Sequence, residues 1–97
     1  MDDASNPAVR RREVLYSGHA PGGGLRYSVQ HLAASYRVVG YVRNLADGRV
    51  QLVAEGAPRE LSDFFAAVRE RLAPHIRTTT EDERPATGEF HDFAIRH

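Results

Sequence analysis

The chain has 97 residues, 41% of them hydrophobic and 27% charged, which predicts one globular domain and excludes a disordered chain. Thirteen basic and thirteen acidic residues cancel to a formal net charge of zero, so we expect no binding to nucleic acid or to anionic membranes through a general positive field. The chain has no cysteine and no lysine, which excludes thiolate nucleophiles, cysteine-bound metal ions and lysine Schiff bases.

Residues 1–11 are mostly polar, include Pro7 and show no hydrophobic periodicity. We expect them to form a flexible tail before a domain over residues 12–97. The longest apolar run, Phe64–Val68, is far shorter than the roughly 20 residues that span a bilayer. The N-terminus also lacks the apolar stretch of a secretory signal. A cytoplasmic location without membrane contact is therefore expected.

A short strand over Val14–Tyr16 is the first predicted element; it ends at Ser17-Gly18 and is followed by the glycine-rich loop His19–Gly24. From there on, the apolar residues follow the spacing of one helix face, at Leu25, Val29, Leu32, Ala33 and Tyr36. This spacing predicts an amphipathic helix of about three turns.

Two further strands are predicted over Val38–Val42 and Val50–Ala54. The Asp47-Gly48 pair between them favours a hairpin, because both residue types tolerate a positive φ. Pro58 suits the first position of a second helix, where its missing N–H is not needed. The apolar stripe of that helix lies at Leu61, Phe64, Phe65, Val68 and Leu72, and Pro74 ends it.

The C-terminal part predicts two extended segments, Ile76–Thr80 and Phe90–Ile95, with an exposed loop over Glu81–Glu89. The resulting order of strands and helices is that of a ferredoxin-like βαββαβ sandwich of the α+β class. In this fold an antiparallel sheet carries two helices on one face.

The segment from Gly18 to Arg26 combines a strand end, several glycines and a helix start. A helix N-terminus offers unpaired N–H groups to an anion, and glycines let the backbone come close to it. The positive charge of Arg26 in the first helical turn interacts unfavourably with the helix dipole and destabilises the helix by about a few tenths of a kcal/mol. A guanidinium–phosphate bond contributes about 1.5–3 kcal/mol, so a bound phosphate reverses that balance. The alternative is a flexible turn beside an ordinary surface arginine.

Asn44 is a second candidate, because a βαβ unit brings the ends of its two strands and the start of its helix to one edge of the sheet. Asn44 ends the second predicted strand, so its carboxamide is expected near Arg26 and the glycine-rich loop. The alternative is that Asn44 opens the hairpin by bonding its own backbone, which asparagine often does.

The run Gly40–Val50, continued to Glu55 and Gly56, is similar to the second signature of the acylphosphatase family. Gly18–Arg26 aligns without a gap with the first signature, Gly-x-Val-Gln-Gly-Val-x-aromatic-Arg. The resemblance covers about Glu13–Arg96 and includes the family's spacing between arginine and asparagine.

The resemblance implies hydrolysis of an acyl phosphate to carboxylate and inorganic phosphate, with no metal ion or cofactor. It implies that Arg26 and Asn44 are the catalytic residues, with Asn44 positioning the attacking water. The phosphate would be held by the loop and helix start, at Gly18, His19, Ala20, Gly22, Gly23, Gly24, Leu25 and Arg26. The expected partners are an acyl phosphate or inorganic phosphate, bound by a monomer.

The loop departs from the family at four positions, where Ala20, Pro21, Gly23 and Leu25 replace valine, glutamine, valine and an aromatic residue. Pro21 has no N–H to offer, and Gly23 adds an ordering cost of about 0.5–1 kcal/mol relative to alanine. We therefore expect a weaker phosphate binder and a slower enzyme than the family norm. A non-catalytic module that binds a small anion or a protein is the alternative.

Two other classes of site are disfavoured by the sequence. The five histidines have no helical i, i+4 pair with a third ligand nearby, so no metal site is expected. RNA-recognition domains share the ferredoxin-like fold, but they stack bases on exposed aromatic residues of the central strands. Val50–Ala54 contains no aromatic residue, which argues against RNA binding.

Overall fold

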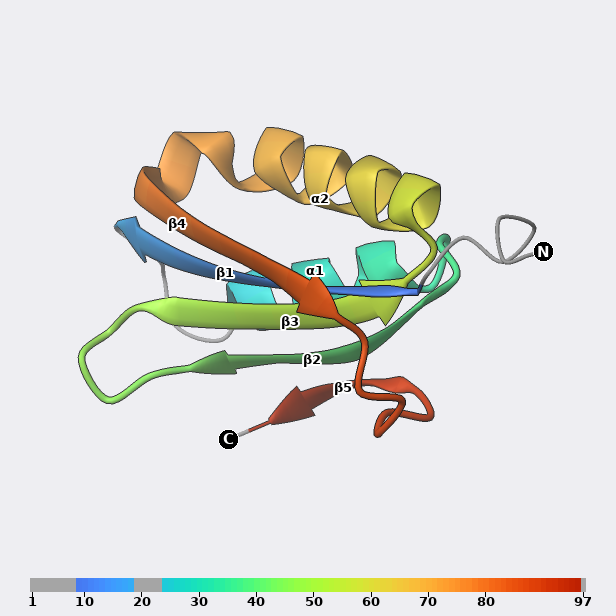
Figure 1. The fold of residues 1–97 in the computed structure, drawn as a ribbon. Coiled ribbons are helices and arrows are strands. Elements are labelled where there is room, and N and C mark those ends of the chain that lie inside the picture. Colours follow the sequence, from blue (N-terminus) through green and yellow to red (C-terminus); the bar gives the residue numbers. More distant parts are fainter. Residues whose placement is uncertain (1–8, 19–23, 97) are drawn as a thin grey trace, which may run out of the picture.

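A computed structural model of the protein describes residues 9–18 and 24–96 (Figure 1). The candidate residues His19, Ala20, Gly22 and Gly23 lie outside the described residues. The elements in chain order are β1 (Arg10–Gly18), α1 (Gly24–Ala33), β2 (Val38–Asn44), β3 (Val50–Gly56), α2 (Pro58–Leu72), the 3-10 turn η1 (Ala73–His75), β4 (Ile76–Pro85) and β5 (Phe93–Arg96).

Five strands form one sheet in the order β4-β1-β3-β2-β5, with both helices on one of its faces (Figure 1). This arrangement confirms the predicted α+β fold with its βαββαβ core. The sheet is mixed, however, and not antiparallel throughout as predicted. The first four strands pair antiparallel, whereas β5 pairs parallel to β2. The reason is that the chain after β4 crosses the sheet and adds β5 at the far edge.

Strand β4 extends to Pro85, so the prediction of an exposed loop over Glu81–Glu89 is wrong for its first half. Ion pairs from β1 hold this part of the strand. Arg12 lies 3.4 Å from a carboxylate oxygen of Glu81 and 3.1 Å from one of Glu83. Because β4 is an edge strand with almost every residue exposed, it lacks the apolar alternation that marks a strand in a sequence.

Strand β1 begins at Arg10, inside the segment predicted to be a flexible tail. Arg10 pairs with Gly56 of β3 and with Pro85 of β4, and its Nε lies 3.3 Å from Glu83. The basic start of β1 and the acidic run of β4 therefore stabilise each other as strands.

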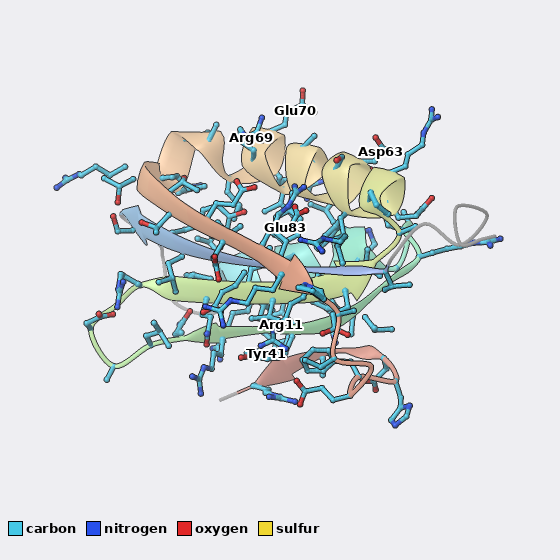
Figure 2. All side chains as sticks on the ribbon, viewed as in Figure 1. Arg11, Tyr41, Asp63, Arg69, Glu70 and Glu83 are labelled. Atoms are coloured by element: carbon cyan, nitrogen blue, oxygen red, sulfur yellow. The ribbon has the colours of Figure 1, made fainter. Side chains whose placement is uncertain are left out.

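The core lies between the sheet and the two helices, as the two apolar stripes predict. Helix α1 ends at Ala33, earlier than the stripe suggested, and Tyr36 in the following turns contacts Phe64 of α2 with ring centroids 5.8 Å apart. Asp63 and Glu70 lie on the side of α2 that points away from the sheet (Figure 2). The largest fully buried side chains are Phe64, Leu52, Leu61, Leu72, Val14, Val29, Val42, Val53 and Val68. None of the helices in the described ranges has the length and apolarity needed to cross a membrane.

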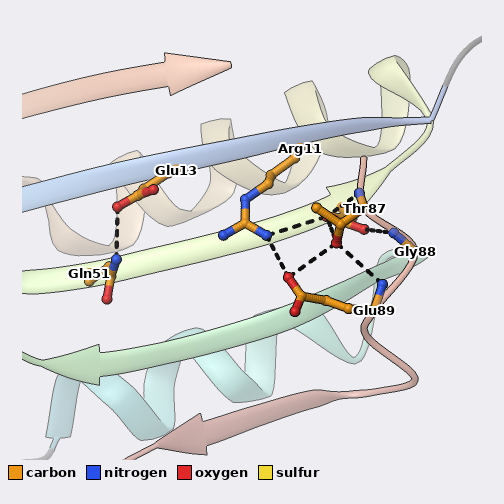
Figure 3. A network of polar contacts seen from close by, with 7 residues as sticks. Arg11, Glu13, Gln51, Thr87, Gly88 and Glu89 are labelled. Carbon is orange, nitrogen blue, oxygen red and sulfur yellow. Dashed lines mark hydrogen bonds and ion pairs between the residues drawn. The ribbon is translucent and has the colours of Figure 1, made fainter. Parts of the chain in front are cut away.

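The crossing from β4 to β5 is anchored by Glu55 of β3, whose side chain is only 2% exposed. Thr87, Gly88 and Glu89 of this crossing lie beside Arg11 of β1 (Figure 3). The backbone N–H groups of Thr87 and Gly88 donate to the two carboxylate oxygens of Glu55 at 2.9 and 3.0 Å. The Thr87 hydroxyl donates at 2.9 Å, and Arg11 Nη1 lies 3.5 Å away. Burial by itself would raise the pKa of Glu55, but these donors and the Arg11 charge outweigh it and lower the pKa.

Replacing Glu55 by glutamine should lower the free energy of unfolding at pH 7 by about 2–3 kcal/mol, because the buried donors lose a charged acceptor. The pKa of Glu55 is lower in the folded state than in the unfolded state. The Glu55 charge therefore makes its full contribution to the free energy of unfolding at pH values above the ordinary pKa of 4.5. It is lost as the pH falls through that value and then through the folded-state pKa. Urea unfolding at pH 7 and pH 3 measures this, and the gap between wild type and variant should shrink at pH 3.

Glu70→Gln is the matched control for this prediction, because Glu70 is exposed on α2. It should unfold like the wild type at pH 7. A gap between wild type and Glu55→Gln that is the same size at both pH values would contradict the assignment of the buried charge.

Candidate active site

The carboxyl ends of β1 and β2 lie at the same end of the sheet, because both strands run antiparallel to β3 between them. Tyr16 of β1 is opposite Val50 of β3, and Val50 is opposite Asn44 of β2. The three residues therefore form one row across the sheet. Helix α1 begins at this end, next to the β2–β3 hairpin (Figure 1).

Asn44 points to the face of the sheet that the helices cover. Side chains alternate along a strand, and Val42, two residues earlier, is fully buried in the core beneath the helices. Val50 and Tyr16 of the same row are also buried there. Asn44 itself is exposed, since it is the last residue of β2. Its carboxamide is thus at the rim of the helix-covered face.

Arg26 is the third residue of α1 and lies in its first turn. The neighbouring Leu25 is buried in the core, which fixes the start of the helix. Arg26 is half-buried, and its Nε is shielded from solvent. The topology thus brings the first turn of α1 and the end of β2 to one end and one face of the sheet.

Asp47, and not Asn44, provides the side-chain bond that shapes the hairpin. Its Oδ1 accepts a hydrogen bond from the Arg49 backbone N–H at 3.0 Å. Gly48 has φ +91°, as the Asp-Gly pair predicted. Within the described residues, the carboxamide of Asn44 makes no hydrogen bond. The alternative function considered for Asn44, opening the turn through its own side chain, therefore belongs to Asp47.

Gly18 has a packing reason to be glycine. A Cβ on Gly18 would lie 2.0 Å from the carbonyl oxygen of His75, the residue before Ile76, with which Gly18 pairs at the start of β4. Gly24, in contrast, has open space where a Cβ would stand. The predicted roles of Gly18, Gly24 and Leu25 in phosphate binding stay predictions.

A small cavity of about 10 Å³, the space of a single water molecule, lies at this end of the sheet. Its walls come from the end of β1, the start of α1, the hairpin, η1 and the start of β4, with Tyr16, Ser17, Gly18, Leu25, Gly48, Val50, His75 and Ile76 as the lining residues. The packing of these walls holds the first turn of α1 at a fixed place relative to the hairpin.

Tyr16 is the titratable group buried in this wall. Its burial, and next the negative charge of Glu81, raise the pKa of the phenol far above its ordinary value of 10.0. Tyr16 is therefore neutral at physiological pH. It neither repels an anion bound nearby nor acts as a base, and the sequence alone had placed it only at the end of the first predicted strand.

A family model described as Acylphosphatase matches residues 12–95. The chain belongs to the acylphosphatase family. The acylphosphatase of Methylococcus capsulatus is 40% identical over 89 residues, which cover 90% of this chain and 96% of that protein. The acylphosphatase of Marinobacter nauticus is 38% identical over 92 residues, which cover 92% of this chain and 98% of its relative. The resemblance found in the sequence is thereby confirmed.

The fold gives the same result. The crystal structure of acylphosphatase from Bacillus subtilis matches this chain with a TM-score of 0.80 and 28% sequence identity, over 91% of this chain and 99% of that one. Family and fold together support an acylphosphatase enzyme, and hydrolysis of acyl phosphates as the general reaction.

Proposed function

We propose that the chain hydrolyses acyl phosphates at the end of the sheet where β1 and β2 end, with Arg26 and Asn44 as catalytic residues. The observation that carries this proposal is the common position of Arg26 and Asn44. They lie far apart in the sequence, but at one end of the sheet and on one face of it. A water oxygen bonds to phosphorus, the bond from phosphorus to the acyl oxygen breaks, and carboxylate and inorganic phosphate leave.

Arg26 is proposed to hold the phosphoryl group together with backbone N–H groups of the loop and of the start of α1. A planar guanidinium makes paired hydrogen bonds to phosphate oxygens, each strengthened by its charge. The partial burial of Arg26 reduces screening by solvent and salt. Its fixed positive charge supplies the neutralisation that the transition state needs, so the proposed reaction requires no metal ion.

Asn44 is proposed to orient the attacking water. A carboxamide accepts a hydrogen bond through its oxygen and donates through its nitrogen, so it can align water without removing its proton. The carboxylate of an acyl phosphate is a good leaving group. Positioning and charge stabilisation therefore suffice, and no strong base is required.

Release of inorganic phosphate from benzoyl phosphate, compared with the uncatalysed rate, tests the proposal. We expect turnover that EDTA at about millimolar concentration does not reduce, and competitive inhibition by inorganic phosphate. Wild-type protein that leaves the uncatalysed rate unchanged would contradict an enzymatic function.

Restoring the family's loop residues should increase activity. The double change of Pro21 to Gln and Gly23 to Val returns a backbone N–H at position 21 and removes the ordering cost of Gly23. One added hydrogen bond to a charged group predicts a rise in kcat/KM of roughly 10-fold. Steady-state kinetics with benzoyl phosphate measure it, and equal rates for the two proteins would show that the loop departures do not limit activity.

The second candidate function is a binding module that has lost turnover. It is favoured by the combination of Arg26 and Asn44 with a loop that departs from the family at four positions. A titration with inorganic phosphate followed by amide NMR distinguishes the two functions. Shifts confined to residues 22–26, in a protein that does not hydrolyse benzoyl phosphate, would identify the binding module.

A further inference from the structure

The hairpin turn that follows Asn44 is closed by hydrogen bonds on both sides of Leu45. The Leu45 carbonyl accepts from the Gly48 N–H at 3.0 Å, and the Leu45 N–H donates to the Arg49 carbonyl at 2.7 Å. Leu45 is joined directly to Asn44 by the peptide bond. The direction of the Asn44 side chain at the exposed end of β2 is therefore set by the bonds of its neighbour to Arg49 and Gly48.

Asp47 holds Arg49 by two separate bonds. Its Oδ1 accepts from the Arg49 backbone N–H at 3.0 Å, and its Oδ2 accepts from Arg49 Nε at 2.8 Å. Asp47, Arg49 and Leu45 thus form a continuous chain of bonds that ends beside Asn44. The Arg49 N–H is the main cause that lowers the pKa of Asp47, so the carboxylate is charged at neutral pH.

We propose that Asp47 is a positioning residue for Asn44: it fixes the turn through Arg49 and thereby holds the Asn44 carboxamide in its productive direction. This inference rests on the proposed function, in which Asn44 orients the water. A strand end without this restraint frays, and a displacement of about 1 Å at a reacting group costs up to about 10²-fold in rate.

The position of the turn predicts which kinetic constant changes. Arg26 belongs to α1, and the other proposed phosphate contacts come from the loop and the start of α1, so none of them is part of the hairpin. Loss of the Asp47 bonds should therefore lower kcat by about 10-fold. This is less than the loss of about 10²-fold expected when a reacting group is displaced by about 1 Å. The inhibition constant of inorganic phosphate should stay at the wild-type value.

The chain provides a matched control in Asp82. Asp82 and Arg84 repeat the same Asp-x-Arg pair on β4, with Arg84 Nε donating to Asp82 Oδ2 at 2.6 Å. The side chains of Asp47 and Asp82 are equally exposed, at 54%. Strands β1 and β3 separate β4 from β2, so removal of the Asp82 side chain should not change the direction of the Asn44 carboxamide.

The experiment measures kcat and KM for benzoyl phosphate, and inhibition by inorganic phosphate, in the wild type, Asp47→Ala, Asp47→Asn and Asp82→Ala. Asp47→Ala should have a lower kcat and an unchanged inhibition constant of inorganic phosphate, and Asp82→Ala should match the wild type in both. Asparagine retains the Oδ1 acceptor for the Arg49 N–H and loses only an exposed ion pair, so Asp47→Asn should stay within about threefold of the wild type.

A double variant separates positioning from a general effect on folding. If Asp47 acts through Asn44, then Asp47→Ala costs nothing further in kcat when Asn44 is already alanine. Additive losses, an equal change in the phosphate inhibition constant, or a wild-type kcat for Asp47→Ala would each overturn the inference. A wild type without turnover would reject the proposed function itself, and the inference with it.

Discussion

Arg26→Gln is expected to lower kcat/KM for benzoyl phosphate by at least about 10³-fold, the lower end of what a transition-state arginine contributes in phosphoryl transfer. Glutamine keeps part of the side-chain length and polarity but removes the charge and the paired N–H donors. Both ground-state phosphate and the transition state lose contacts. The inhibition constant of inorganic phosphate should therefore rise together with the fall in kcat.

Arg59→Gln is the matched control. Arg59 is the second residue of α2, exposed, and in the first turn of its helix, so the change removes the same charge from an equivalent position on the other helix. We expect activity equal to the wild type. Similar losses in the two variants would show that activity depends on total charge and not on Arg26.

Arg26→Lys tests the geometry of the guanidinium as distinct from its charge. An ammonium is a point charge without the planar fork that pairs with two phosphate oxygens. Lysine should therefore recover only part of the loss of Arg26→Gln, mainly in the inhibition constant of inorganic phosphate. Full activity of Arg26→Lys would show that charge alone is needed.

The central elements follow from the sequence because their signals are local. The apolar stripe of α2 and Pro58 at its first position define that helix, and the structure has it over Pro58–Leu72. The Asp47-Gly48 pair defines the hairpin, and Gly48 takes the positive φ that it requires. In each case the physical cause acts within a few residues of the chain.

The edges of the sheet could not be predicted in the same way. Strand β4 depends on Arg12 and its neighbours of β1, about seventy residues away in the chain. The position of β5 depends on a crossing held by Glu55, whose partners include the backbone N–H groups of Thr87 and Gly88. A backbone N–H group has no signature in the sequence, so this anchor is visible only in the structure.

The candidate site was predictable where topology determines it. A βαβ unit places the start of its helix at the end of its strands, which brings Arg26 and Asn44 to one end of the sheet from sequence reasoning alone. Only part of the role of Asp47 could be predicted from the sequence. Its bond to the Arg49 N–H is a common turn contact, but its connection to Asn44 through Leu45 requires the hydrogen bonds of the folded hairpin.

Asn44→Ala should lower kcat for benzoyl phosphate by about 10²–10³-fold, the usual effect of losing one preorganised hydrogen-bonding group. Asn44 is exposed and its carboxamide makes no hydrogen bond within the described residues. The midpoint of thermal unfolding should therefore stay close to that of the wild type. Gln30→Ala, which removes a carboxamide from an exposed position of α1, should change neither property.

The inhibition constant of inorganic phosphate distinguishes the role of Asn44 from that of Arg26. A residue that orients water contributes in the transition state but not to the bound phosphoryl group, so Asn44→Ala should leave this constant unchanged. Arg26→Gln should raise it. If Asn44→Ala raised the constant as much as it lowered kcat, the carboxamide would be a phosphate ligand, and the attacking water would need another partner at this end of the sheet.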